Sequence, residues 1–220
     1  MSFPTDPFEQ LHYNMVRAHQ TFKLGYDAIL KNLENNQEAI KSDLTNFLGY
    51  CQAWVISIDT HHDSEEEIVF PFLNQKMDFE PEKEAHKVIH KGLSDITAIV
   101  TQFKADPSKF DPDHLKENLV KLKDPLFEHL DVEVEHIKSS KLKEVGFGDA
   151  ELKDLNQRLD KYAQSHGDPF LVVPYMRSHT PPELKNVWPP MPWVLRKVVI
   201  PYVLAWKHSG YWKYAPYSVS

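Results

Sequence analysis

The sequence predicts an all-α protein: an antiparallel, up-down four-helix bundle with an additional helix and a proline- and aromatic-rich C-terminal extension. Four amphipathic segments predict the bundle, because their core-facing side chains recur at alternating steps of three and four residues. Only three of the seven glycines occur in the first 140 residues, which favours long helices there. Prolines and tryptophans instead gather after residue 168, where the helical pattern is lost.

The first helix is expected to begin at Asp6-Pro7-Phe8-Glu9. This run supplies a capping aspartate, a proline at the first helical position and an acidic residue in the first turn. The turn that follows this helix is expected near residue 41, and both Asn35-Asn36 and Ser42-Asp43 are plausible breaks. The core-facing stripe of the first helix contains Phe8, Met15, His19, Phe22, Tyr26, Ile29 and Leu33.

Three further stripes complete the predicted bundle, and alternating steps of this kind are typical of antiparallel helices that cross at about 20°. The loops between them contain helix breakers, at Asn74–Pro81 and Ala105–Pro112, and Asp111-Pro112 repeats the opening helix signal. The second stripe is Leu44, Phe47, Cys51, Trp54, Ile58, His61, Glu65, Ile68 and Phe72. The third is His86, Ile89, Leu93, Ile96, Val100 and Phe103. The fourth is Leu115, Leu119, Leu122, Leu126, His129, Glu133 and His136.

The expected division of the chain is a bundle at 7–138, an extra helix within 139–167 and an irregular extension at 168–220. The extension has six basic and two acidic residues and therefore a net charge of +4. Because the whole chain has a net charge of −7, residues 1–167 have a net charge of −11. One interpretation is that the extension packs on the bundle and pairs its positive charge with the acidic domain. The other is that its basic, aromatic stretch from Trp188 to Trp212 rests on an acidic membrane surface.

Composition excludes several classes of protein. A net charge of −7 argues against nucleic-acid binding, which needs a basic surface. The single cysteine, Cys51, rules out an internal disulfide framework and suits a reducing compartment. We find neither the pattern of a secretory signal nor an apolar run long enough to span a membrane. A cytoplasmic location is therefore expected.

Polar side chains replace apolar ones at one height of the predicted bundle. Burying an imidazole or a carboxylate without a partner costs on the order of 1–3 kcal/mol. Three pairs of polar residues are spaced i, i+4, which brings both side chains of a pair to one face of a helix. The pairs are His61 with Glu65, His86 with His90, and His129 with Glu133. The pairs also lie at equal distances from the intervening loops, so they should meet at one height. We therefore predict a metal site formed by His19, His61, Glu65, His86, His90, His129 and Glu133.

Neighbouring residues offer alternatives at two positions, and a third position lies beside its stripe. His62 and Glu66 also form an i, i+4 pair, but the stripe continues through His61 and Glu65. His90 lies beside the third stripe, because Ile89 occupies the core-facing step.

A nitrogen-rich site with two carboxylates suits Fe, Mn or Zn, and the absence of thiolates argues against a structural zinc site. Seven ligands are too many for one tetrahedral ion, which predicts a dinuclear site with room for a small additional ligand.

At these residues the chain resembles the hemerythrin-like, or HHE cation-binding, family. The most specific match is the run His61-His62-Asp63-Ser64-Glu65-Glu66-Glu67-Ile68-Val69-Phe70-Pro71. The other matches are His19, the His86-Lys-Val-Ile-His90 segment, and His129 with Glu133. The resemblance covers roughly residues 7–138, and the proline-rich extension resembles that of fungal members.

The resemblance implies a non-haem di-iron centre in which carboxylates and a solvent oxygen bridge the two ions, although Zn or Mn is not excluded. His19, His61, His86, His90 and His129 would be terminal ligands, and Glu65 and Glu133 would be bridges. His90 is similar to the additional histidine of the oxygen-carrying hemerythrins. Glu133 departs from those carriers, which have an aspartate one residue further along the helix, and matches the broader HHE pattern.

The function expected from this reading is binding of iron and of a diatomic ligand, O2 or NO. We find no separate catalytic acid or base in the pattern, so a metal- and gas-binding protein is favoured over a turnover enzyme. The alternative is an iron sensor or store that a partner protein reads. A ferritin-like oxidase would need two Glu-x-x-His motifs, and only Glu133-Val-Glu-His136 fits.

Overall fold

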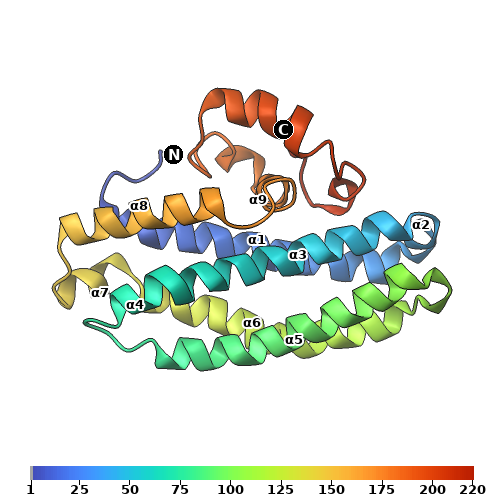
Figure 1. The fold of residues 1–220 in the computed structure, drawn as a ribbon, viewed down its shortest axis with the longest axis horizontal. Coiled ribbons are helices and arrows are strands. Elements are labelled where there is room, and N and C mark those ends of the chain that lie inside the picture. Colours follow the sequence, from blue (N-terminus) through green and yellow to red (C-terminus); the bar gives the residue numbers. More distant parts are fainter. Residues whose placement is uncertain (1) are drawn as a thin grey trace.

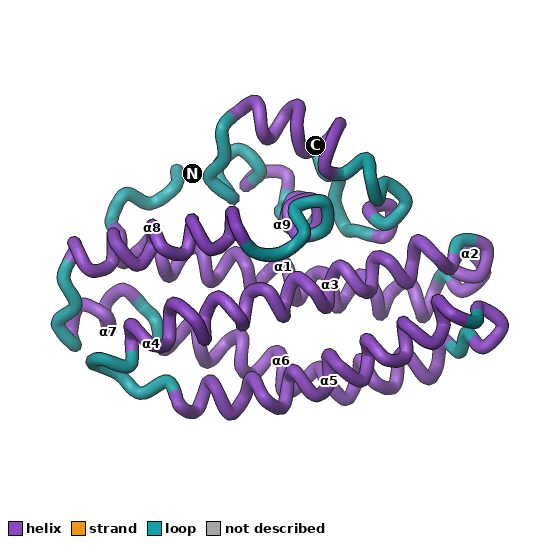
Figure 2. The backbone as a smooth tube through the Cα atoms, in the orientation of Figure 1, coloured by secondary structure: helices purple, strands orange, loops and turns teal. Residues whose placement is uncertain are grey.

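The computed structural model describes residues 2–220, and within this range it contains helices, turns and loops but no strand (Figure 2). Four long helices lie side by side, with consecutive ones running in opposite directions (Figure 1). They are α1 (Pro7–Asn35), α3 (Leu44–Ser64), α5 (Glu80–Ala105) and α6 (Pro112–His136). The predicted all-α class is confirmed.

Capping side chains start two of the long helices where the sequence predicts. The Asp6 carboxylate accepts hydrogen bonds from the backbone N–H groups of Phe8 and Glu9, at 2.8 and 3.4 Å. Asp111 caps α6 in the same way, at 3.0 and 3.1 Å from the backbone nitrogens of the second and third helical residues. In both cases proline follows the cap, where its missing N–H leaves no bond unmade.

The connection between α1 and α3 uses both predicted breaks. Helix α1 ends at Asn35, the short helix α2 (Gln37–Ser42) follows, and α3 begins after Asp43. Ile40 is fully buried, so α2 closes one end of the core rather than forming an open loop. The two breaks therefore flank one helical turn that covers this end of the core.

A π-helical turn interrupts the second long helix at Glu65–Val69, before the short helix α4 (Phe70–Leu73). A π-turn adds one residue to a helical repeat and shifts every later side chain around the axis. Val69 is accordingly buried, whereas the predicted core residue Ile68 is only partly buried. Such turns are frequent at functional sites, and this one begins at a predicted metal ligand.

The buried core consists of two apolar clusters, and the predicted ligands lie between them. On α1, Met15 belongs to one cluster and Phe22 to the other, so that His19 lies between the two. On the second long helix, Ile58 and Val69 flank the site in the same way. The polar height predicted from the sequence is therefore a single layer enclosed by apolar side chains on both sides.

Two further helices pack near the start of α1. They are α7 (Ser139–Glu144) and the amphipathic α8 (Asp149–Ser165), which contacts α1, α3 and the π-turn. Asn156 on α8 donates a hydrogen bond to the backbone carbonyl of Pro7, at 2.9 Å. After α8 the chain turns at Gly167, whose φ of 79° is in the left-handed region that favours glycine.

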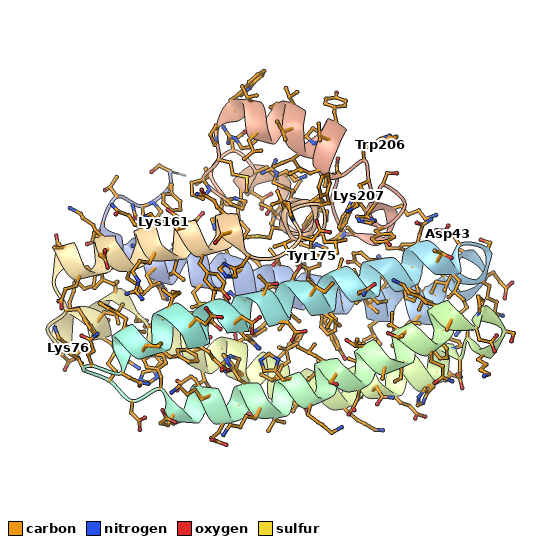
Figure 3. The ribbon with its side chains drawn as sticks, viewed as in Figure 1. Asp43, Lys76, Lys161, Tyr175, Trp206 and Lys207 are labelled. Atoms are coloured by element: carbon orange, nitrogen blue, oxygen red, sulfur yellow. The ribbon has the colours of Figure 1, made fainter. Side chains whose placement is uncertain are left out.

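The C-terminal extension, residues 168–220, packs on α1 and α3 through buried aromatic side chains. It contains α9 (Val172–Ser178), a π-helix at Leu195–Leu204 and two short 3-10 turns, Pro182–Leu184 and Trp212–Tyr214. Tyr175 lies where α9 meets the long helices (Figure 3) and donates a hydrogen bond from its hydroxyl to the Thr21 carbonyl, at 2.8 Å. A Cβ atom on Gly25 would lie 2.2 Å from the Tyr175 hydroxyl oxygen, so this close approach requires glycine.

Charge pairing contributes little to this attachment. Among the described residues, one ion pair joins the extension to the rest of the chain, between Lys213 and Asp43. Buried aromatic contacts and hydrogen bonds predominate instead, such as that from Trp188 Nε1 to Asn14 Oδ1 at 3.0 Å. No helix of the described chain combines the length and the apolar character needed to cross a membrane.

Candidate metal centre

The structure brings six of the seven predicted ligand residues together in the polar layer. One comes from α1, two from the second long helix, one from α5 and two from α6. All except His61 are almost completely buried, and the His61 side chain is 15% exposed. The six residues are His19, His61, Glu65, His86, His129 and Glu133.

The histidines form two pairs whose ring nitrogens face each other. His19 Nε2 lies 3.0 Å from His61 Nε2, and His86 Nε2 lies 3.0 Å from His129 Nε2. We call these the His19–His61 pair and the His86–His129 pair. Two nitrogens that bind one ion at about 2.1 Å and at right angles are separated by about 3.0 Å. Each pair therefore has the spacing of two ligands of one metal ion.

Both carboxylates lie between the two pairs. One Glu65 oxygen is 2.8 Å from His61 Nε2 and the other is 3.6 Å from His86 Nε2. Glu133 Oε2 is 3.5 Å from both His19 Nε2 and His129 Nε2. Each carboxylate thus contacts one histidine of each pair, which is the arrangement that a carboxylate bridging two ions requires.

Hydrogen bonds to the outer ring nitrogens orient two of the histidines. His19 Nδ1 donates to the Leu130 carbonyl at 2.7 Å, and His86 Nδ1 donates to Glu66 Oε1 at 2.8 Å. Because a neutral imidazole has one N–H group, these bonds leave Nε2 unprotonated and directed into the polar layer. Metal-binding histidines are commonly held by a carbonyl or carboxylate in this way.

Burial keeps these imidazoles in the neutral form that binds metals. It lowers the pKa of His19 and His86, and it lowers the pKa of His129 to about 3. Glu65 and Glu133 differ from each other. Burial acts to raise the Glu65 pKa, but the adjacent His61 and His19 outweigh it and hold the pKa well below its usual range. Burial and the neighbouring Glu65 raise the pKa of Glu133.

His62, which the stripe had placed beside the core, is fully buried in the same layer. Its ring stacks on His86, with ring centroids 3.9 Å apart, and neither of its nitrogens has a hydrogen-bond partner among the described residues. Both Glu133 oxygens also have no such partner. Ligand atoms of His62, Glu65, His86 and His129 lie within 4.8 Å of one another. Unpartnered buried polar groups are rare and costly, so this set fits a cation.

The sequence of the second long helix also contains a second regular stripe, and this one includes His62. Cys51, Val55, Ile58, His62, Glu65, Val69 and Phe72 are all buried and also follow one another at alternating steps of four and three. The second long helix therefore buries a face wide enough for both stripes. His61 projects from one side of this face toward His19, and His62 projects from the other side toward His86.

His90 lies at the edge of the layer. Its side chain is 35% exposed, and its Nδ1 is 3.0 Å from a carboxylate oxygen of Asp59. Ligand atoms of His90, Glu66 and His86 also lie within 4.8 Å of one another, but Glu66 is exposed and already accepts a hydrogen bond from His86 Nδ1. His136, which lies on the fourth stripe one turn beyond Glu133, bonds to Glu82 at 2.6 Å rather than to a ligand residue.

Comparison with known proteins identifies the family. Residues 10–139, more than half of the chain, match the family model for the hemerythrin HHE cation binding domain. The chain belongs to this family. Membership implies cation binding, with iron as the family's characteristic ion, and the buried histidine–glutamate cluster is compatible with it.

A fungal protein is among the relatives of this hemerythrin-domain chain. The "Dimeric xanthone biosynthesis cluster protein R11" of Cryptosporiopsis sp. (strain 8999) is 26% identical over 184 residues. The alignment covers 80% of this chain and 67% of the fungal protein, so it extends beyond the hemerythrin domain. No solved structure matches the chain significantly.

Proposed function

We propose that this protein holds two iron ions in a hemerythrin-type four-helix bundle and binds a diatomic gas, O2 or NO, at that centre. The proposal rests on the His19–His61 pair and the His86–His129 pair, in each of which the two Nε2 atoms are 3.0 Å apart. Each of the two carboxylates contacts one histidine of each pair. Two ions of charge +2 would also stabilise the buried Glu65 carboxylate and give the Glu133 oxygens the partner that they lack among the described residues.

The histidines divide unequally between the two ions in this proposal. His19 and His61 would hold one ion, and His62, His86 and His129 the other, with Glu65 and Glu133 shared. When bound, the iron would supply an open coordination position for a small ligand, and that position would be on the ion held by two histidines, because it has fewer protein ligands. Phe22 lies on that side, with its ring centroid 5.1 Å from that of His61.

The surrounding residues would restrict what reaches the centre. Apolar side chains adjacent to the ligands along the four helices are buried, so most of the layer is shielded from bulk water, and His61 is its partly exposed member. Leu130 and Glu66 fix the orientation of two histidines before any ion binds, which reduces the ordering cost of binding. The buried neighbours are Met15, Phe22, Ile58, Ile89, Leu93 and Leu126.

Reconstitution with ferrous iron under anaerobic conditions tests the proposal. Elemental analysis should give about two iron atoms per chain, and exposure to O2 or NO, or to azide after oxidation, should change the visible spectrum. A ratio near one would contradict the dinuclear site. A two-iron protein whose spectrum responds to none of the three ligands would instead support an iron sensor or store.

The share assigned to His62 gives a separate prediction. We expect His62→Leu to lose about half of the bound iron, because it removes one of the three histidines of one ion. His90→Leu should retain nearly all of it, because His90 is partly exposed and paired with Asp59. Elemental analysis of both proteins after iron loading and desalting measures the difference. Loss of iron only in His90→Leu would place His90, and not His62, among the ligands.

A further inference from the structure

The C-terminal extension presents an unusual exposed surface on its π-helix and on the residues directly before and after it. Most exposed large hydrophobic side chains of the described chain occur within residues 193–206, and the others are single valines elsewhere. Trp206 is 75% exposed, Tyr202 is 74% exposed and Trp193 is 63% exposed. We call this surface the aromatic face, and it consists of Trp193, Val194, Val198, Tyr202, Val203 and Trp206.

The aromatic face is the outward side of a helix that has apolar side chains on both its buried and its exposed sides. A π-helix returns to the same side after roughly four or five residues. Ile200 and Ala205, five residues apart, are buried toward the protein, whereas Val194, Val198 and Tyr202, spaced by four, are exposed. The π-helix is the segment of the extension that lies farthest from the long helices (Figure 1), and Figure 3 shows Trp206 at the outer edge of the molecule.

The attachment of the extension holds this face outward. Gly49 provides a second close contact like that at Gly25, since a Cβ atom there would lie 2.1 Å from the Tyr211 ring. Trp212 Nε1 donates to the Ala205 carbonyl at 3.1 Å, which ties the end of the π-helix to a buried residue. These contacts fix the buried side of the extension, so its exposed side is not a consequence of loose packing.

Charge around the aromatic face is mainly positive, with one acidic residue nearby, Asp168, which pairs with Lys207 at 3.6 Å. After Glu183 the chain contains no acidic residue, whereas Arg196, Lys197 and Lys207 lie within or next to the π-helix. Lys197 is exposed and has no carboxylate within ion-pair distance among the described residues. A partner for this surface must therefore be both apolar and anionic.

We propose that the aromatic face binds the surface of an anionic lipid membrane. Tryptophan and tyrosine rings favour the depth of the lipid headgroups, and adjacent lysines and arginines are attracted to anionic headgroups. A second copy of this chain in a symmetric dimer would bring two basic surfaces together, which is unfavourable. The net charge of −11 on residues 1–167 repels the same membrane, so the protein docks only by the extension.

Vesicle sedimentation with the full-length, iron-loaded protein tests this proposal. The protein should pellet with vesicles of phosphatidylcholine and phosphatidylserine in equal parts, should not pellet with phosphatidylcholine alone, and should be released by salt. Tyr202→Glu/Trp206→Glu should lower the partition coefficient by about tenfold or more. The matched control, Val120→Glu/Val132→Glu, adds the same charge at valines of α6 that are 52% and 53% exposed and should bind like the wild-type protein.

Three results of the sedimentation assay would overturn the proposal: no pelleting of the wild-type protein at low salt, equal loss in both double variants, or pelleting that Tyr202→Glu/Trp206→Glu leaves unchanged. A wild-type dimer that this variant converts to a monomer would also overturn it, because a second copy would then cover the face. Brominated lipid gives a test without mutation. It should quench the fluorescence of the exposed tryptophans in the wild-type protein, and unchanged emission would contradict membrane contact.

Discussion

The Glu65→Gln protein is expected to retain less than half of the iron that the wild-type protein binds. Glu65 contacts His61 with one oxygen and His86 with the other, so its loss affects both histidine pairs. The amide keeps the volume of the side chain but removes its charge, which leaves the two ions with Glu133 as their one shared anionic ligand. Elemental analysis after iron loading and desalting measures the effect.

Glu66→Gln is the matched control, because it makes the same chemical change one residue away. The Glu66 side chain is 45% exposed and holds only the outer nitrogen of His86, a contact that the glutamine amide oxygen can replace. We expect this protein to keep nearly all of its iron. An emptied site in Glu66→Gln combined with a full site in Glu65→Gln would show that the helix faces were assigned to the wrong residues.

Removal of the metal should lower the melting temperature by roughly 5–10 °C, and reloading should restore it. Binding to the folded state alone contributes about 2.7 kcal/mol when the free metal concentration is a hundredfold above Kd. For a chain of this size, each kcal/mol changes the melting temperature by about 2–4 °C. Calorimetry before and after chelation, with the iron content confirmed at each stage, measures the shift.

The Glu133→Met protein separates the energy of the metal from that of the bundle. Glu133 is fully buried, and its oxygens have no hydrogen-bond partner among the described residues. Methionine has a similar size and needs no partner, so the metal-free variant should be more stable than the metal-free wild-type protein by about 1–3 kcal/mol. It should also lose the stabilisation by iron. An unchanged melting temperature after confirmed metal loss would contradict the linkage between the site and stability.

Metal removal is expected to destabilise the wild-type protein, whereas Glu133→Met is expected to stabilise the metal-free protein, and both effects have the same physical origin. A layer of imidazoles and carboxylates in an apolar core destabilises the empty protein, and the same groups stabilise the loaded one. The two apolar clusters on either side of the layer, built from residues such as Phe22 and Val69, stabilise the fold enough to offset the cost of the empty polar layer. Stability given up at a functional site and recovered on binding is a common trade in proteins.

Local interactions explain why the sequence predicted the helices well. The aspartate caps at Asp6 and Asp111 act within three residues of themselves, so they can be read without knowledge of the fold. The two breaks around α2 are local for the same reason. The height of the polar layer was also predictable, because the pairs recur at equal distances from the loops that connect antiparallel helices.

The sequence by itself determined the helical class, the helix starts and the polar layer, because each depends on short-range spacing. Only the tertiary structure decided which side chains enter that layer. His61 and His62 lie on equally regular stripes, and contacts with α1 and α5 bring both of them inward. His90 turns toward Asp59 on another helix, which no local pattern reveals. The outward aromatic face is likewise a tertiary result, because the sequence of a helix with apolar side chains on both sides does not specify which side the rest of the protein covers.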